Sequence, residues 1–392
     1  MRAKWIGLFV SMAISIATGC SNVGFQSIPK LSCDSVSAAQ DTACQLVGST
    51  LFYNLTFKSG EVDIIFVDDN SGSMWARQQK MGSAFPTFFN SIKGLFYQIA
   101  IVTTDVSATP GNVPSAANGN GAFQDGQFLP FHSTAGVNSG LSVIDQSTPN
   151  AADLFSGTIQ RQETLNCANA GFAEASCPAD DERGIYALNM AADRNQNGFF
   201  RPGAPLEIII LANEDERSQG GVDYGDGNTP AALENYDLPA TLVAKMSALF
   251  PSKAVTVHAI VTDTTACMKS EFNISPAGIV TFGYLGTQYM DLAQPTSALS
   301  ALGNIQPGVV GSICASDYGS QLGSIAQDVI KNTKNSPKQL PCNPDATKIV
   351  LTTTPANYAP QIQYSINSSN QVTFSNVPTG VTVNFAYQCP RF

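Results

Sequence analysis

Charged residues, and basic ones above all, are scarce in this sequence. Only 13% of its 392 residues are charged, and 20 Lys and Arg residues against 30 Asp and Glu residues give a net charge of −10. A chain with so few cations offers no basic patch to neutralise phosphates, so we expect neither a nucleic acid nor a nucleotide as partner. Gly, Ser, Thr, Asn and Gln take the place of Lys and Glu, a composition common among exported proteins.

The motifs of common hydrolases are also missing. The sequence has no GxSxG nucleophile elbow and no HExxH zinc motif. Of its two histidines, His258 lies in a buried-strand pattern and is expected in the core, whereas His132 lies in a predicted loop. We therefore expect a protein that is not an enzyme. The alternative is a metal-assisted hydrolase with Ser71 or Ser73 as nucleophile and His132 near it.

The first twenty residues form a predicted export signal. Arg2 and Lys4 precede an apolar stretch, 6–17, that is shorter than the roughly 20 residues needed to span a membrane. Ala17-Thr18-Gly19-Cys20 resembles a bacterial lipobox, which implies cleavage before Cys20 and attachment of lipid to that residue. The alternative is an ordinary secretory peptide with a coincidental cysteine. We expect a lipid-anchored protein of the bacterial cell envelope, with Ser21 after the anchor indicating the outer membrane.

The cysteine count agrees with export. Nine cysteines are present, and eight remain if Cys20 carries lipid. An even number in an exported protein indicates disulfides rather than a metal cluster, and no CxxC pair suggests structural zinc. Many pairings are possible, but neighbours along the sequence suggest Cys33–Cys44, Cys167–Cys177, Cys267–Cys314 and Cys342–Cys389.

Strand and helix patterns alternate between residues 61 and 336. Apolar, β-branched runs predict strands buried on both faces at Val62–Val67, Phe96–Thr103, Leu206–Ala212 and Ala254–Val261. Apolar residues at helical spacing predict helices at Met74–Lys93, Glu182–Ala192, Pro230–Phe250 and Asp317–Asn332. This order predicts an α/β fold with a doubly wound, mostly parallel sheet. The long connections 106–177 and 262–316 are expected to be mostly loop.

The pattern changes after residue 336, where polar and apolar residues alternate without helical spacing. This predicts a small antiparallel unit of about four strands, at Lys348–Thr353, Gln361–Ile366, Gln371–Phe374 and Val381–Tyr387. The expected organisation is a signal peptide (1–19), a lipidated tether with an edge strand of the main domain at Leu51–Phe57 (20–60), the α/β domain (61–336) and a small β appendage (337–392).

Asp69, Ser71 and Ser73 follow the first buried strand at alternate positions. Ligands of open α/β sheets bind beyond the carboxyl ends of the strands, and a carboxylate with two hydroxyls suits Mg²⁺, Ca²⁺ or Mn²⁺. Asp69-Asn70-Ser71-Gly72-Ser73 matches the DxSxS pattern of the metal-ion-dependent adhesion site, and the chain thereby resembles the von Willebrand factor A family. The alternative is a polar strand-to-helix turn with Ser71 or Ser73 as the helix N-cap.

The resemblance implies cation ligands from three loops. In the family the second loop usually supplies a Thr five residues before the small-Leu pair of the next helix, and Glu182 occupies that position here. The third loop usually supplies an Asp directly after a buried strand. Here Asn213 stands at that position, with Glu214 or Asp215 able to substitute. Similarity to bacterial lipoproteins with A domains extends to Val67–Met74, Val102–Asp105, Gly198–Arg201, Glu214–Ser218 and Ser312–Asp317.

The resemblance also implies binding rather than catalysis. A cation at this site, Mg²⁺ first with Ca²⁺ or Mn²⁺ as alternatives, would keep a coordination position open for a carboxylate of a protein partner. The altered second and third loops leave another interpretation open, a structural or assembly protein of the envelope whose metal site has degenerated.

Two further acidic stretches carry weaker signals. Asp193–Gly198 matches the first half of an EF-hand loop, but Ala204 stands where the bidentate Glu is required, so we expect a turn that ends a helix. The alternative is a second cation site. Asp223–Asn228 is expected to be a solvated loop.

Overall fold

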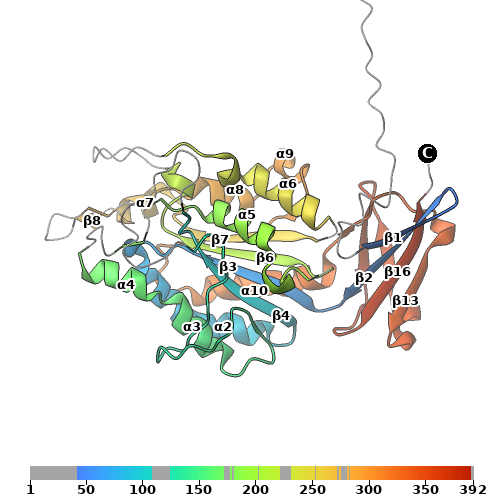
Figure 1. The fold of residues 1–392 in the computed structure, drawn as a ribbon, viewed down its shortest axis with the longest axis horizontal. Helices are drawn as coiled ribbons and strands as arrows, with labels where there is room; N and C mark the ends of the chain where they lie inside the picture. The colour runs from blue at the N-terminus through green and yellow to red at the C-terminus, as the bar shows by residue number, and fades with distance from the viewer. Residues whose placement is uncertain are drawn as a thin grey trace, which may run out of the picture.

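The computed structural model describes residues 42–107, 124–171, 177–178, 181–201, 203–220, 231–251, 253–271, 273–274, 280–281 and 283–389. They form an α/β domain with a β-sandwich at one end, as Figure 1 shows. The predicted fold class is confirmed, because a mostly parallel sheet runs through the larger part and small antiparallel sheets form the other.

The central sheet has the strand order β10-β7-β6-β3-β4-β5, with β11 also paired to β7. Its strands are β3 (Glu61–Asp68), β4 (Phe96–Thr103), β5 (Ile144–Asp145), β6 (Leu206–Ala212), β7 (Val255–Val261), β10 (Ile305–Gln306) and β11 (Val310–Ser312). All pairs are parallel except that of β5 with β4. Strand β3 lies between β4 and β6, and Asp68 stands opposite Thr103 on one side and Leu211 on the other. The segments that leave β3, β4 and β6 therefore begin at the same edge.

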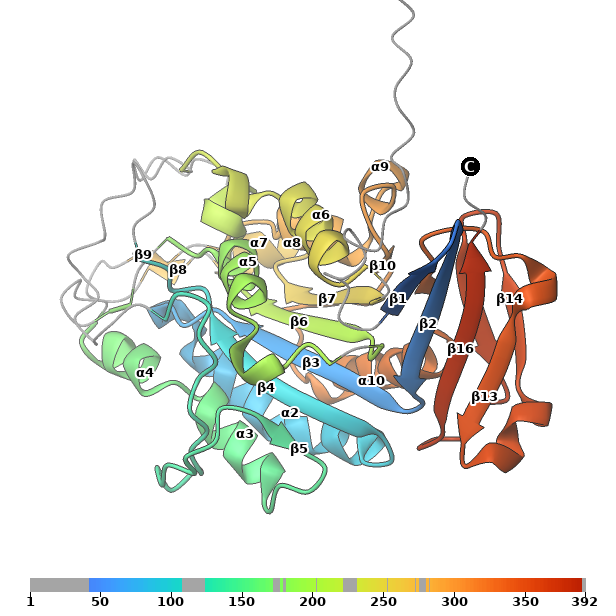
Figure 2. The ribbon, with the colours of Figure 1, turned by 45° about the vertical axis from the view of Figure 1, so that its right-hand side comes forward.

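Helices cover both faces of this sheet, as Figures 1 and 2 show. Ile64 and Phe66 of β3 pack into the cluster that includes α2 (Trp75–Ile92), α3 (Ala151–Ile159) and α10 (Gly319–Asn335). Ile65 and Val67 pack into the opposite cluster, which includes α5 (Gly184–Arg194), α6 (Pro239–Leu249) and α8 (Thr287–Ala293). Alternate residues thus belong to opposite cores, as expected for a strand buried on both faces.

Parts of the long connections 106–177 and 262–316 are helical rather than loop. The first contains α3 and α4 (Gln162–Asn169), and the second contains α7 (Thr265–Glu271), α8, α9 (Ser297–Ser300) and the hairpin of β8 (Asn273–Ile274) and β9 (Val280–Thr281). The helices form because they bury apolar side chains such as Phe155, Met268 and Leu292.

Residues 42–58 together with residues 338–389 form two small sheets that pack face to face. One has the order β1-β2-β16-β13 and the other β12-β15-β14. Their bounds are β1 (Thr42–Val47), β2 (Thr50–Lys58), β12 (Lys338–Gln339), β13 (Val350–Thr354), β14 (Gln363–Ile366), β15 (Gln371–Ser375) and β16 (Thr382–Cys389). Leu55, Phe57, Val372, Phe374 and Phe385 belong to the core between them. The predicted antiparallel unit is confirmed.

The placement of Leu51–Phe57 at the edge of the main domain is wrong. This segment is β2, and it pairs with β16 from Lys58 opposite Thr382 to Leu51 opposite Cys389. Leu51, Tyr53, Leu55 and Phe57 are buried, whereas the residues between them are not. Such one-sided burial suits a sandwich sheet, while the central sheet requires burial on both faces.

Three of the four predicted disulfides are present: Cys167–Cys177, Cys267–Cys314 and Cys342–Cys389. The lipid site Cys20 and the predicted pair Cys33–Cys44 are not assessed, because Cys20 and Cys33 lie outside the described residues. Among the helices that the structure describes, none combines the length and the apolar character needed to cross a membrane.

Candidate metal site

The loop that leaves β3 carries the DxSxS residues. The backbone N–H of Asp69 donates to the carbonyl of Leu211 at the end of β6 (3.0 Å), and the N–H of Ser71 donates back to Asp69 Oδ1 (2.9 Å). Residues Gly72–Met74 then form the short 3₁₀ helix η1, which leads into α2. Ser71 precedes η1, but its side chain makes no capping hydrogen bond, and Met74 is the N-cap of α2. Ser71 thus occupies the N-cap position of η1, as the alternative interpretation expects, but without a capping hydrogen bond from its hydroxyl.

The hydroxyls of the two serines are instead linked to the loop after β6. Ser71 Oγ lies 3.1 Å from Ser73 Oγ, and Ser73 Oγ donates a hydrogen bond of 3.0 Å to Asn213 Oδ1. The structure thus brings Asp69, Ser71 and Ser73 together with Asn213. These four come from the first and third loops implied by the resemblance.

The Asp69 carboxylate is fully buried and only half satisfied. Its Oδ1 accepts the Ser71 N–H, but its Oδ2 has no hydrogen-bond partner. Burial raises the pKa of Asp69 to about 6, and hydrogen bonds from Ser71 and the backbone of Asn213 oppose this rise. A buried carboxylate oxygen without a donor is costly, so the arrangement fits a hard cation that would bind Oδ2.

Asp215 presents a second carboxylate of the same kind. Its Oδ1 accepts the backbone N–H of Gln288 in α8 (2.9 Å), whereas its buried Oδ2 has no hydrogen-bond partner. Burial raises the pKa of Asp215 to about 7. Burial and the charges of Glu216, Asp215 and Asp69 raise the pKa of the buried Tyr289 hydroxyl.

Glu214 and Glu182 are placed differently. The carboxylate of the half-buried Glu214 accepts a hydrogen bond from the Ser218 hydroxyl (3.0 Å). Glu182 is buried, and its carbonyl accepts the N–H of Arg217 (2.8 Å), while the next residue, Arg183, donates its N–H to the carbonyl of Thr104 (3.1 Å). Glu182 is therefore fixed between the segment after β4 and the segment after β6.

A buried ionic network holds these loops in place. Arg183 makes two hydrogen bonds of 2.8 Å to the Asp237 carboxylate. Arg217 contacts Asp181 at 3.0 Å and Glu234 at 3.3 Å. Sequence patterns did not identify this network. The only available signal was the density of charge at Asp181–Arg183 and Glu214–Arg217 in a chain that has little charge elsewhere.

Glu216 joins the network to a helix. Its carboxylate accepts the N–H groups of Ile185 (2.8 Å) and Tyr186 (3.1 Å) in the first turn of α5 and the hydroxyl of Tyr289 (3.0 Å). A carboxylate at this position satisfies N–H groups that have no partner within the helix. The helix that follows the second loop is thereby attached to the third loop.

The remaining candidates lie elsewhere. Asp193 accepts hydrogen bonds from Lys245 (2.6 Å) and Tyr236 (3.2 Å). His258 is buried in β7, as expected, with its Nε2 2.9 Å from Glu207. The ring of His132 contacts the carbonyl of Ser133 (3.2 Å). The stretch Asp223–Asn228 lies outside the described residues.

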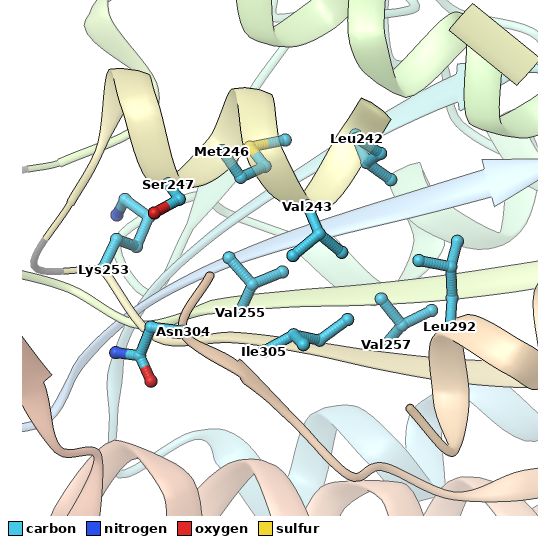
Figure 3. Close-up of a pocket in the computed structure, with 10 residues that line it drawn as sticks. All are labelled: Leu242, Val243, Met246, Ser247, Lys253, Val255, Val257, Leu292, Asn304 and Ile305. Carbon is cyan, nitrogen blue, oxygen red and sulfur yellow. The ribbon is translucent and has the colours of Figure 1, made fainter. Parts of the chain in front are cut away.

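The crevice in Figure 3 lies between α6 and strands β7 and β10. Its lining is mainly apolar, with Val243, Met246, Val257 and Ile305 among the side chains, and its volume is about 10 Å³. This is roughly the space that one water molecule needs. The crevice therefore reflects imperfect packing rather than a ligand site.

In the described part of the chain, no group of three or more His, Cys, Asp or Glu side chains could hold a metal ion. The set around Asp69 consists instead of carboxylate, hydroxyl and amide oxygens. Such oxygens are the ligands of Mg²⁺ and Ca²⁺.

No protein-family model and no curated protein sequence matches this chain. Among solved structures, it is similar to a von Willebrand factor type A protein from Catenulispora acidiphila (13% identity, TM-score 0.32, 89% of this chain and 65% of that chain). It is also similar to proximal thread matrix protein 1 from the mussel byssus (13%, 0.31, 71% and 48%) and to the human COPII-coat protein Sec24c (9%, 0.32, 86% and 42%). The chain spans less than two thirds of each of these proteins, and the fold class rests on its own strand order.

Proposed function

We propose that this chain binds a divalent cation at the edge where β3 and β6 end, and that the cation holds a carboxylate of a protein partner. The observation that carries this proposal is the buried Oδ2 of Asp69, which has no hydrogen-bond partner. In the same loops, the hydroxyls of Ser71 and Ser73 and the amide oxygen of Asn213 are linked to one another. The similarity of Asp69–Ser73 to the adhesion-site motif supports the same assignment.

The residues assigned to the cation are Asp69, Ser71, Ser73 and Asn213. Asp215 and Glu182 lie in the neighbouring loops, but their carboxylates do not join that of Asp69 in a group that could hold one ion. Glu214 is less suited, because its carboxylate already binds Ser218. Because Asp69 is the only carboxylate in this set and hydroxyl and amide ligands are neutral, one of the two positive charges of the cation would remain unneutralised. That charge would attract a carboxylate from a partner, and Mg²⁺ is the first candidate, with Ca²⁺ or Mn²⁺ as alternatives.

We further propose that the protein acts in the bacterial cell envelope, where lipid on Cys20 anchors it. Its partners would bind at the end of the α/β domain that lies opposite the β-sandwich. The lipobox-like Ala17–Cys20 and the three disulfides support export.

A degenerate site in a structural or assembly protein is the second candidate. The observation that favours it is Asn213, which occupies the position of the usual Asp and accepts a hydrogen bond from Ser73. In that case the same hydrogen bonds would hold the loop without a cation.

Calorimetric titration of the purified chain with MgCl₂, CaCl₂ and MnCl₂ separates the two candidates. The adhesion-type site predicts cation binding that Asp69→Ala weakens at least a hundredfold. Asp291→Asn, which changes an exposed carboxylate of α8, should leave the affinity unchanged. Equal affinity in the wild-type chain and in folded Asp69→Ala would overturn the assignment of this site, and no binding at all would favour the structural candidate.

A further inference from the structure

A second group of buried oxygens lies on the other face of β3. Asp68 and Thr103 are direct partners in the parallel pair of β3 and β4. Both lie on the face of Phe66 and Ile101, toward α2, and both are fully buried. The Cα atoms of partners on adjacent strands are about 5 Å apart, so these two side chains stand next to each other beneath α2 and α4.

The polar atoms of this group are incompletely satisfied. Asp68 Oδ1 and Thr103 Oγ1 have no hydrogen-bond partner, and neither side-chain atom of the buried Asn70 has one. Gln78 Nε2 is the donor to Asp68 Oδ2 (3.0 Å), the carbonyl of Asp69 (3.0 Å) and Thr164 Oγ1 (3.3 Å). An amide nitrogen has two hydrogens, so Gln78 Nε2 cannot satisfy all three of these acceptors at once.

Asp68 also has no cationic partner within hydrogen-bonding distance among the described residues. The positive charge of Arg161 acts to lower the pKa of Asp68, but the Arg161 guanidinium forms its ion pair with Glu163, at 2.6 Å. Asp69 and Glu163 add negative charge around Asp68. Buried charges in proteins are paired or bind metal ions, and a region rich in oxygen acceptors and negative charge favours a cation.

We propose that Asp68, Thr103 and Asn70 form a second, buried site for a hard cation, distinct from the Asp69 site. Ca²⁺ is the favoured ion, because it accepts carboxylate, hydroxyl and amide oxygens at 2.3–2.6 Å in flexible geometry. Two oxygens too far apart for a hydrogen bond can share such an ion. A buried water could also supply donors to these oxygens, with a proton in place of the ion because burial raises the pKa of Asp68 well above its usual range.

The site would lie between the end of the sheet and the helices α2 and α4 on one of its faces. Asp68 comes from β3, Thr103 from β4, and Gln78 and Thr164 connect the group to α2 and α4. The hydroxyl of Thr164 also donates to the carbonyl of Asn70 (2.7 Å). A bound cation would therefore fasten the base of the DxSxS loop from the side opposite Asp69.

Equilibrium dialysis of the full chain against Ca²⁺, with bound calcium counted per chain, tests this proposal. We expect two ions in the wild-type chain, one in Asp69→Ala, one in Asp68→Asn and none in the double variant. Thr103→Val, which keeps the side-chain shape on the neighbouring strand, should weaken one of the two binding steps at least tenfold. Asp291→Asn should still bind two ions.

The thermal midpoint of unfolding, followed by circular dichroism, gives a second readout. Ca²⁺ should raise the midpoint of Asp69→Ala but not that of the double variant, because an ion that binds only the native state stabilises it. One ion in the wild-type chain, lost in Asp69→Ala, would overturn the second site and leave a buried water in its place. One ion that is lost in Asp68→Asn and Thr103→Val but retained in Asp69→Ala would support the second site and contradict the proposed adhesion site.

Discussion

The hydroxyl of Ser73 donates its hydrogen bond to the side-chain oxygen of Asn213, a residue 140 positions further along the chain. The contact is possible because β3 and β6 are parallel neighbours whose carboxyl ends meet at one edge. It links a side chain of the DxSxS loop directly to a side chain of the loop after β6. The effect of this amide on cation affinity can therefore be measured directly.

Replacing Asn213 by Asp should strengthen cation binding. The carboxylate keeps an acceptor for Ser73 and adds a negative charge, so we expect the Kd for Mg²⁺ to fall about tenfold, which corresponds to about 1.4 kcal/mol. Calorimetric titration at pH 7.5 provides the measurement. Glu214→Gln serves as the control, because Glu214 binds Ser218 and its change should alter Kd less than twofold. An unchanged Kd in Asn213→Asp would show that residue 213 does not reach the ion.

Cation affinity should fall in acid. Burial raises the pKa of Asp69 to about 6, and a carboxylate must lose its proton to bind a metal. We expect the Kd for Mg²⁺ to be nearly constant above pH 7 and to rise about tenfold for each pH unit below about 6. Titrations between pH 5 and 8 would show this. A pH-independent Kd across that range would contradict the role of Asp69.

Lowering the pH should stabilise the cation-free chain against unfolding, although it weakens cation binding. The folded-state pKa of Asp69 lies above its unfolded value, so protonation favours the folded chain. The stabilisation from this group is complete below about pH 4 and is lost as the pH rises through about 6, with a total on the order of 3 kcal/mol. Urea unfolding in EDTA, compared between wild type and Asp69→Asn, isolates this contribution, which the variant should lack.

Removing the Arg183 guanidinium should be strongly destabilising. Arg183→Leu leaves the fully buried Asp237 without its two short hydrogen bonds, and breaking one side of such a pair costs about 3–5 kcal/mol. Urea denaturation measures the loss. Lys331→Ala is the control, because Lys331 is 72% exposed and its contact with Asp328 is on the surface, where pairs contribute at most about 1 kcal/mol. Equal losses in the two variants would refute a structural role for the buried pair.

The sandwich should depend on the Cys342–Cys389 disulfide. The bond closes a segment of 47 residues, and the double change to Ser should cost about 4 kcal/mol by the chain-entropy estimate. Hydrogen exchange should quicken in β2 and β16 more than in β3. The double Ser variant of Cys167 and Cys177 is the milder comparison, because the disulfide that it removes closes only 10 residues. Unchanged protection of β2 would contradict its place in the sandwich.

The central strand and its site loop were predictable because their signals are local. Val62–Val67 is apolar at every position except Asp63, and Asp69, Ser71 and Ser73 lie within five residues of each other. Strand β2 was different. The alternation of Leu51, Tyr53 and Leu55 shows that one face is buried, but it contains no information about which sheet provides the covering layer. That choice depends on β16, near the other end of the chain.

Short elements and long-range charge pairs escaped prediction for related reasons. Helices α7 and α8 are too short for a clear 3.6-residue period, and their burial depends on contacts with the central sheet. Arg183 and Asp237 are separated by 54 positions, and charge in a sequence does not reveal its partner. The buried oxygens of Asp68 and Thr103 became visible only once the register of β3 and β4 was known.

The order of β2, the turn at Ser59-Gly60 and β3 has a mechanical consequence. The sandwich lies at the start of β3 and the Asp69 loop at its end, so the two are connected through a strand of eight residues. A pull between an N-terminal anchor and a partner held at Asp69 would run along β3. Because β4 and β6 flank β3 in parallel register on both sides, that force would load both rows of hydrogen bonds in shear at once, the direction in which a sheet resists separation best.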